Sequence, residues 1–163
     1  MPITSESFRD VLRHFPAGVT IVTIKSPASD ALHGLTVSAF ASVSPEPPLV
    51  LVSIDHRATA YELLECAGAS FAVNILAHDQ MELSNRFAWL KDEDRFEQGE
   101  WDTAATGAPI LRDALAWLDC TVYSRLAAGS HTIYIGEVQA SGVARADVKP
   151  LVYWNRGYRQ LAK

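Results

Sequence analysis

Short turns, rather than helices, join many of the strand-like stretches in this chain, and this pattern favours an antiparallel β fold. Val19–Lys25 is rich in β-branched residues, and His33–Ser44 alternates apolar and small hydroxyl residues through much of its length. Both patterns are typical of β-strands. The turn Ser26–Asp30 separates them, so the two stretches are predicted to form a hairpin. A doubly wound parallel sheet is disfavoured, because its strands would alternate regularly with helices.

Further strands are predicted along the rest of the chain. They are Leu49–Ile54, Ser70–Leu76, Ala116–Ala127, His131–Val143 and Leu151–Trp154. The turn Ala128–Gly129–Ser130 makes the third and fourth of these antiparallel partners. The nearly continuous apolar character of Leu49–Ile54 indicates burial on both faces. Pro45–Pro48 is a rigid connector, because its prolines cannot donate to a sheet.

Apolar residues at helical spacing predict a few helices among these strands. The first is Ser5–Phe15, with Ser5 as its N-cap and a stop at Pro16. Thr59–Cys66 and Gln80–Leu90 are the others, and Lys91–Gly107 is predicted to be a long loop. About six or seven strands with two or three helical insertions fit a mainly β fold, a barrel with helical insertions.

Composition limits the class of protein. The 163 residues fit a single domain, 1–163, and 48% of them are hydrophobic, as in ordinary globular proteins. The net charge is −5 with no basic run, so a nucleic-acid partner is not expected. No apolar run has the length of a membrane span and the N-terminus has no signal-peptide pattern, so a cytoplasmic protein is expected.

The cysteines and histidines give no indication of a metal site. Cys66 and Cys120 lie far apart in the sequence and are predicted to be small buried residues. The five histidines are scattered, without the spacing of a metal-binding motif.

The stretch His33–Ser44 has the residue types of an anion site. Hydroxyl groups and successive backbone N–H groups can hold a phosphate without a helix. The alternative is an ordinary strand with Ser and Thr on its solvent face. The sequence contains neither a GxGxxG motif nor a Walker lysine motif, which removes the two commonest phosphate-loop architectures.

Eight stretches, in the same order, resemble the short-chain flavin reductase family over nearly the whole chain. They are FRDVLRHFPAGVTIVT, GLTVSAFASVSPEPPLVLVSI, FAVNIL, QMELSNRFA, RF at Arg95–Phe96, ALAWLDC, GSHTIYIGEV and PLVYWNRGYRQL. The resemblance implies an FMN-binding split barrel of antiparallel Greek-key type. It also implies an enzyme that reduces FMN or FAD with NADH or NADPH and supplies reduced flavin to a partner monooxygenase. Such enzymes usually form homodimers, with flavin sites near the subunit interface.

By this resemblance, one group of residues is predicted to bind the flavin. Along the flavin ring lie Thr36, Val37, Ser38 and Ala39; near the ribityl chain or phosphate lie Ser42 and Ser44; beside them lie Ser53, Ile54, Asp55, Asn74, Ile75 and Leu76. Arg86, or else Arg95, is expected to supply positive charge for the phosphate. The alternative for Asn74 is an amide satisfied within the fold, and for each arginine it is a solvated surface charge.

In the context of this resemblance, His131, which follows a tight turn at the mouth of a hairpin, is the residue predicted to contact the nicotinamide. The alternative is a structural histidine at the start of a strand. The family often has Asp before this His, whereas this chain has Ser130. Tyr158 is expected either to close over the site or simply to pack, and Phe96 is similarly ambiguous.

Other functions also fit the sequence. One is a flavin-binding protein of the same fold that is not a reductase. Another is a heme- or ligand-binding split barrel, and a third is a purely structural barrel subunit.

Overall fold

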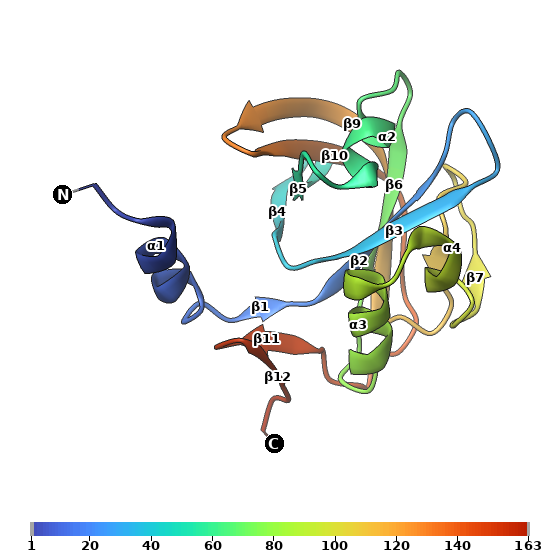
Figure 1. Ribbon diagram of the computed structural model, residues 1–163. Helices are drawn as coiled ribbons and strands as arrows, with labels where there is room; N and C mark the ends of the chain where they lie inside the picture. The colour runs from blue at the N-terminus through green and yellow to red at the C-terminus, as the bar shows by residue number, and fades with distance from the viewer. Residues whose placement is uncertain (1, 163) are drawn as a thin grey trace.

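The computed structural model describes residues 2–162, except the side chains of residues 92 and 93. A seven-stranded sheet with the order β3-β2-β6-β9-β10-β5-β4 dominates the fold (Figure 1). Its strands are β2 (Thr20–Lys25), β3 (Leu32–Val37), β4 (Phe40–Pro45), β5 (Pro48–Asp55), β6 (Ser70–Ile75), β9 (Ala116–Ala128) and β10 (His131–Val143). All neighbouring strands are antiparallel, which confirms the predicted fold class.

The sheet curls into a barrel that is split between β3 and β4. These strands are the two edges of the sheet, yet only Ser38 and Ala39 separate them in the chain. The edges must therefore meet at these two residues, which is possible only if the sheet bends round on itself. The prediction of one strand within His33–Ser44 that loosens into a loop at its far end was wrong in this respect, because the chain passes from one sheet edge to the other near its midpoint and continues as a second strand.

The predicted hairpins are confirmed. β2 pairs with β3, and β9 pairs with β10 around the two-residue turn Gly129–Ser130. Gly129 has a φ of 62°, a left-handed conformation that glycine adopts without steric cost. β4 and β5 pair as far as Pro45 and Pro48, so the proline-rich connector is a turn at the end of an edge hairpin.

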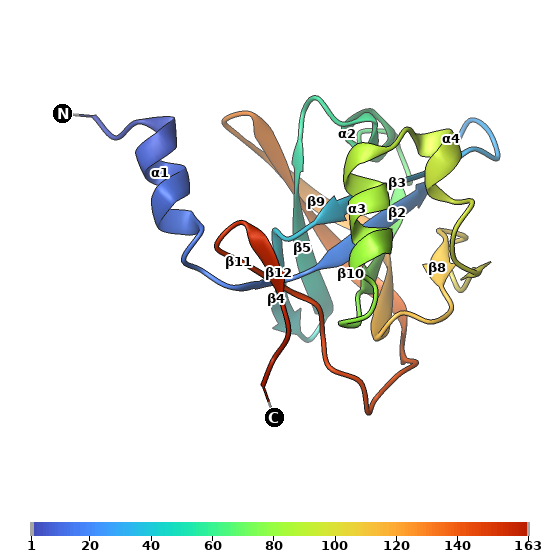
Figure 2. The ribbon, with the colours of Figure 1, turned by 60° about the horizontal axis from the view of Figure 1, so that its bottom comes forward.

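Helices cover only part of the barrel. α3 (Met81–Trp89) packs across β2 and β3, as Figure 2 shows, and α2 (Thr59–Leu64) lies at one end. α1 (Ser5–Leu12) projects from the barrel and has no buried residue. Its N-cap is Thr4 instead of the predicted Ser5, since the Thr4 hydroxyl accepts a hydrogen bond from the Ser7 amide at 3.1 Å. No helix within residues 2–162 is long and apolar enough to span a bilayer.

A second, three-stranded sheet joins the two ends of the chain. β1 (Ala17–Gly18) pairs with β11 (Val152–Trp154), which turns back into β12 (Gly157–Arg159). This hairpin also holds the end of α1. The indole of Trp154 donates to the His14 carbonyl at 3.1 Å, and the Asn155 amide donates to the Arg13 carbonyl at 2.9 Å.

The prediction of a loop over Lys91–Gly107 was partly wrong. The segment contains α4 (Asp92–Arg95) and β7 (Trp101–Asp102), and β7 pairs with β8 (Ile110–Leu111). Aromatic packing holds this region to α3, with ring centroids of Phe87 and Phe96 5.1 Å apart. Such contacts join residues distant in sequence, so local composition did not predict them.

The two larger of the three hydrophobic clusters among the described residues account for most of the core. One fills the barrel interior and includes Val22, Phe71 and Tyr134. The other lies beneath α3 and includes Ile21 and Phe87. β2 is buried on both faces because alternate side chains enter the two clusters.

The expectation that Leu49–Ile54 is buried on both faces was wrong. Val50, Val52 and Ile54 are buried, whereas Leu49, Leu51 and Ser53 are only half-buried. The inward face of β5 fills the barrel, and its outward face is only partly covered by the described chain.

The two predicted buried cysteines differ. Cys66 is exposed, contrary to prediction, whereas Cys120 is buried and its burial raises the pKa of its thiol to about 12.

Candidate functional site

Three adjoining cavities lie along the split between β3 and β4. The first, here called the basic cavity, has a volume of about 530 Å³ and is lined by His33, Arg57, Lys91 and Arg95 among others. The second, the middle cavity, has a volume of about 340 Å³, and the third, the α1 cavity, about 600 Å³. Because Thr36 and Trp89 line the first two and Ser38 lines the last two, the three form one cleft.

The predicted ring-binding stretch Thr36–Ala39 lies at the centre of this cleft. Ser38 and Ala39 are exposed, whereas the Val37 side chain is buried in the barrel interior. Thr36 donates its hydroxyl hydrogen to the Ser84 carbonyl at 2.6 Å, which ties β3 to α3. The split therefore presents Ser38 and Ala39 to the cavities, and the paired strands on either side fix their position.

Tyr158 closes one side of the middle cavity. Its hydroxyl donates to Asn85 Oδ1 at 3.0 Å and lies 2.8 Å from the Ser84 hydroxyl. These bonds hold β12 against α3. Tyr158 thus both packs and lines the cleft, which combines the two alternatives considered for it.

Close packing under the basic cavity explains a glycine in β3. A Cβ atom on Gly34 would lie 2.6 Å from Cε1 of Phe87 and 3.2 Å from Cζ of Phe96. Any larger residue at this position would push α3 and the following segment away from the sheet. Phe96 therefore lies behind the cavity wall as part of its support.

The two arginines proposed for a phosphate have different positions. Arg95 lines the basic cavity and donates from Nε to the Leu90 carbonyl at 2.7 Å. Arg86 binds the Asp94 carbonyl at 2.9 Å and a carboxylate oxygen of Glu97 at 3.0 Å, which fastens α3 to α4. The geometry favours Arg95 over Arg86 as a group that faces a ligand.

Sequence reasoning missed four side chains of the basic cavity: His33, Arg57, Trp89 and Lys91. They come from β3, the segment before α2, the end of α3 and the link from α3 to α4, so only the fold brings them together. Trp89 is 82% exposed, an unusual state for so large an apolar ring. Its position at the end of α3, directly before the charged segment, was the signal available in the sequence.

Asp55 connects the basic cavity with His131. Its carboxylate pairs with Arg57, with 2.6 Å between Oδ2 and a guanidinium nitrogen. This hydrogen bond, aided by the charges of Arg57 and His131, lowers the pKa of Asp55 well below its usual range. In the sheet, Asp55 stands opposite His131.

His131 is half-buried at the start of β10, outside the three cavities. Its Nδ1 lies 3.0 Å from the Ser130 hydroxyl, so the residue that replaces the family's usual Asp contacts the imidazole. The neighbouring His56 forms a hydrogen bond of 3.0 Å with Thr132. The hairpin end thus carries an oriented imidazole beside the Asp55–Arg57 pair.

The remaining predicted residues lie outside these cavities. Ser42 is exposed on β4, and the Ser44 hydroxyl binds the backbone of Glu46 in the β4–β5 turn. Ser53 is half-buried on the outer face of β5, whereas Ile54 and Leu76 belong to the hydrophobic clusters. Ile75 pairs with Thr20 and Ala116 within the sheet.

Asn74 is satisfied inside the fold. Its amide nitrogen donates to the Ile21 carbonyl and the Thr23 hydroxyl, both at 3.1 Å, and its oxygen accepts from the Leu111 amide at 2.8 Å. It is fully buried, so these bonds offset the cost of burying its polar atoms. The geometry supports the structural alternative.

These residues suit a ligand with a flat ring and a phosphate. Backbone and hydroxyl groups at Ser38, the exposed Trp89 ring and the cations of the basic cavity can bind such a ligand along the cleft. Among the described side chains, which leave out residues 92 and 93, no cluster of three His, Cys, Asp or Glu residues is placed to hold a metal ion. The fold and the site thus define a nucleotide-binding β-barrel protein.

Comparison with known proteins identifies the family. The flavin reductase-like domain matches residues 12–162. The reductase component of the FADH2-dependent resorcinol hydroxylase of Rhizobium sp. (strain MTP-10005) is 38% identical over 154 residues, covering 94% of this chain and 85% of that protein. An NADH-dependent FMN reductase of Variovorax paradoxus is 36% identical, covering 95% of this chain and 84% of that protein.

A solved structure gives the same result. The NADH:FAD oxidoreductase of Streptomyces globisporus C-1027, in complex with NAD and FAD fragments, superposes with a TM-score of 0.88 at 30% identity, covering 99% of this chain and 97% of that one. This chain belongs to the flavin reductase-like family. The expected oxidoreductase class, with FMN or FAD and a nicotinamide nucleotide as its ligands, is confirmed.

Proposed function

We propose that this protein transfers a hydride from NADH or NADPH to FMN or FAD bound in the cleft between β3 and β4. The observation that carries this proposal is the exposed Ser38–Ala39 junction beside a cavity lined by four cationic or potentially cationic side chains. The nicotinamide supplies the hydride and the flavin accepts it, so the protein has to bind and orient the two ligands. Membership of the flavin reductase-like family supports the same function.

In this arrangement the flavin phosphate binds in the basic cavity, near Arg57, Lys91 and Arg95. The ring lies along Thr36–Ala39 in the middle cavity, where backbone N–H groups can bind its carbonyl oxygens and N5. Tyr158 and Trp89 border the space that remains for the ring. A donor near N1 and the C2 carbonyl stabilises the negative charge of the reduced flavin.

Steady-state oxidation of NADH and NADPH with riboflavin, FMN and FAD tests the activity. Lys91→Ala is expected to raise the Kd for FMN about tenfold, as loss of one charge-assisted contact would, and to leave riboflavin binding unchanged. Lys25→Ala is the control, because Lys25 pairs with Asp30 in the β2–β3 turn, outside the three cavities. No oxidation of either nucleotide with any flavin would refute the proposal.

We also propose that the protein is a homodimer. α1 has no buried residue; Phe8 within it is 51% exposed, and Phe15, three residues after its end, is 75% exposed. Leu51 and Ile133 lie half-buried on the outward face of β5 and β10. A second copy that covers this face would bury apolar surface and bring its own chain close to His131. Light scattering that gives a monomer at micromolar concentration would contradict this proposal.

The partner follows from the proposed activity. The reduced flavin would pass to a separate monooxygenase, and release of reduced FMN through an ultrafiltration membrane under anaerobic conditions tests this.

We propose a cytoplasmic location, since both cysteines are free, as is usual in a reducing compartment. We also propose that residues 1–163 act as one flavin reductase-like domain.

A further inference from the structure

The ends of β5 and β10 place one carboxylate beside two groups that can carry positive charge. Asp55 pairs with Arg57, two residues later in the chain, and stands opposite His131 in the antiparallel register. Side chains of directly opposed residues lie on the same face of a sheet, with Cβ atoms about 5 Å apart. The hydrogen bond from Arg57 and, more weakly, the charge of His131 lower the pKa of Asp55. The carboxylate is therefore within reach of both groups.

The hairpin end holds His131 in place. Its Nδ1 lies 3.0 Å from the Ser130 hydroxyl, and the His56 amide donates to the Ser130 carbonyl at 3.0 Å. The second of these bonds ties the end of β5 to the β9–β10 turn. The ring of His56 is engaged elsewhere, by the Thr132 hydroxyl at 3.0 Å. Asp55 and His131 thus face each other across strand ends whose spacing is fixed.

Arg57 is held far less firmly than His131. Its side chain is 89% exposed, against 27% for Asp55, and an exposed ion pair contributes little to stability. Asp55 binds Nε of Arg57 at 3.1 Å and Nη2 at 2.6 Å. Because Arg57 also lines the basic cavity, it can turn to a phosphate there. A phosphate and a carboxylate on one exposed guanidinium repel each other, so an anion bound to Arg57 favours the departure of Asp55.

The strand ends lie close to the predicted ring-binding junction. The Ser53 amide donates to the Ala39 carbonyl at 3.1 Å, and Ser53 stands opposite Ile133. Asp55 and His131 follow at the last position of β5 and the first of β10, at the border of the face proposed for a second copy. Two strand spacings, about 10 Å, separate the strand of Ala39 from that of His131. A nicotinamide stacked on a flavin ring at Ala39 therefore comes near Asp55 and His131.

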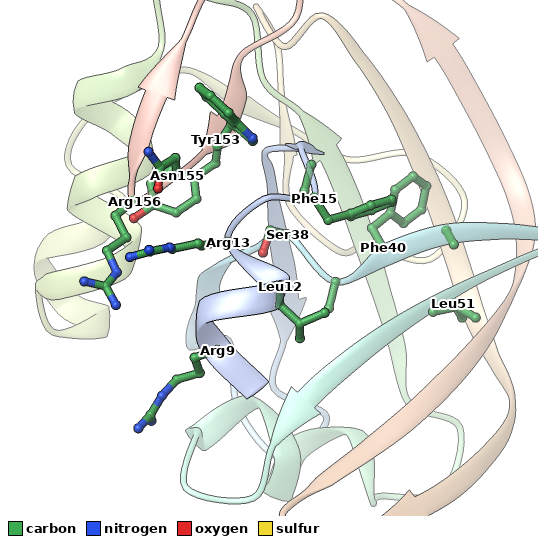
Figure 3. A pocket seen from close by; sticks show the side chains of 14 residues that line it. Arg9, Leu12, Arg13, Phe15, Ser38, Phe40, Leu51, Tyr153, Asn155 and Arg156 are labelled. Atoms are coloured by element: carbon green, nitrogen blue, oxygen red, sulfur yellow. The ribbon is translucent and has the colours of Figure 1, made fainter. Parts of the chain in front are cut away.

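The arginines of the α1 cavity have a carboxylate of their own. Figure 3 shows Arg13 and Arg156 on one side of Ser38, and Asp10 lies 3.4 Å from Arg13 and 3.2 Å from Arg156. The rest of the cavity lining is mainly apolar, which suits the second copy proposed for this face. These ion pairs belong to α1 and the β11–β12 turn, so they are separate from the pair at Asp55.

We infer that a flavin phosphate bound to Arg57 frees the Asp55 carboxylate for His131, so that a phosphorylated flavin promotes its own reduction. This inference rests on the proposed function, since it takes the flavin phosphate to bind in the basic cavity. Asp55 is a positioning residue, because it accepts a hydrogen bond from the imidazole and fixes the ring. Its negative charge also lies near the nicotinamide, which becomes positive as the hydride leaves it for the flavin. In the free protein, Arg57 masks this charge.

Arg57→Ala and Lys91→Ala form a matched pair of variants. Each removes a cation from the basic cavity, and Arg57 is the one that binds Asp55. In nitrogen NMR of histidine-labelled protein, FMN should move the His131 ring signals more than riboflavin does. Free Arg57→Ala should already show the signals of the FMN complex. Free Lys91→Ala should show those of the free unaltered protein.

Stopped-flow reduction with saturating NADH and flavin gives the second readout. The unaltered protein should reduce FMN about tenfold faster than riboflavin, as one added hydrogen bond to a charged group would allow. Arg57→Ala should bind FMN more weakly but reduce both flavins at the faster rate. Asp55→Asn should reduce both at the slower rate. Its melting temperature and oligomeric state should not change, because Asn keeps an oxygen for the Arg57 amide, which Asp55 binds at 2.9 Å.

Several outcomes would overturn the inference. Equal reduction rates for FMN and riboflavin in the unaltered protein would do so, as would identical His131 signals in free Arg57→Ala and Lys91→Ala. A lower melting temperature or a changed oligomeric state in Asp55→Asn would assign Asp55 to the scaffold instead. Failure of the proposed function would look different, because the unaltered protein would oxidise no NADH while the response of His131 to FMN is still measurable.

Discussion

The two ends of the cleft are built in different ways. The basic cavity rests on the aromatic packing of Phe87, Phe96 and Trp101 beneath Gly34. The α1 cavity is bordered by a helix with no buried residue and by a hairpin with a strained turn. The difference indicates that the basic-cavity end, where we propose that the flavin phosphate binds, is preorganised by the core, whereas the other end depends on surface elements that are held by a few polar contacts.

The largest expected effect is at the support of the basic cavity. Phe87→Ala should lower the free energy of unfolding by about 3–5 kcal/mol, because it leaves a void between α3 and β3. Urea denaturation measures this, with Met81→Ala as a control on the same helix, since Met81 is 48% exposed. A loss below about 1 kcal/mol for Phe87→Ala would show that this end is not preorganised by packing.

His131→Ala should lower kcat/KM for NADH by about tenfold to a hundredfold and leave the Kd for FMN nearly unchanged. The Kd for FMN should not change because His131 lies beside Asp55, outside the three cavities. The value of kcat/KM should fall because His131 is the residue predicted to contact the nicotinamide. Stopped-flow reduction of bound FMN measures the effect. His14→Ala is the control, and equal kinetics in both variants would remove His131 from the site.

Trp89→Ala should raise the Kd for FMN about fivefold to tenfold without a change in stability beyond about 0.5 kcal/mol. An exposed indole that lines two cavities offers ring contact to a flavin but little packing to the fold. Flavin fluorescence titration gives the Kd. A large loss of stability with unchanged affinity would assign Trp89 to the scaffold instead.

The smallest expected effect concerns the Asp55–Arg57 pair. Because Arg57 lowers the pKa of Asp55, the pair stabilises the folded state above the unfolded pKa of about 3.9, and this contribution is lost as the pH falls through the lower folded value. An NMR titration of the Asp55 carboxyl should show a pKa below that of the unfolded chain. Arg57→Ala should return it toward the ordinary value, and an equal pKa in both proteins would contradict the pairing.

Local pattern predicted most of the fold. β-Branched runs and short turns gave the antiparallel strands and hairpins, because pairing across a short turn depends on residues close in sequence. The split at Ser38–Ala39 was missed, since it arises from closure of the whole barrel. The outward face of Leu51 was also missed, because alternation in burial depends on what covers the sheet.

The site was predicted only in part. Thr36, Ser38, Ala39, Arg95 and Tyr158 line the cleft, and their contacts with the flavin, which the family resemblance implies, stay predictions. Asn74 is a polar residue in an apolar strand, as a site residue can be, but its side chain forms its hydrogen bonds with groups inside the fold. Arg57 and Lys91 were missed because they lie on loops whose convergence depends on α2 and α3 packing against β3.

The crystal structure of the complex with FMN tests the central claim most directly. The phosphate is expected in the basic cavity, near Arg57, Lys91 and Arg95, with the flavin ring against Thr36–Ala39. A flavin bound elsewhere, or a phosphate on the far side of Ser38 beside Arg13 and Arg156, would contradict this account.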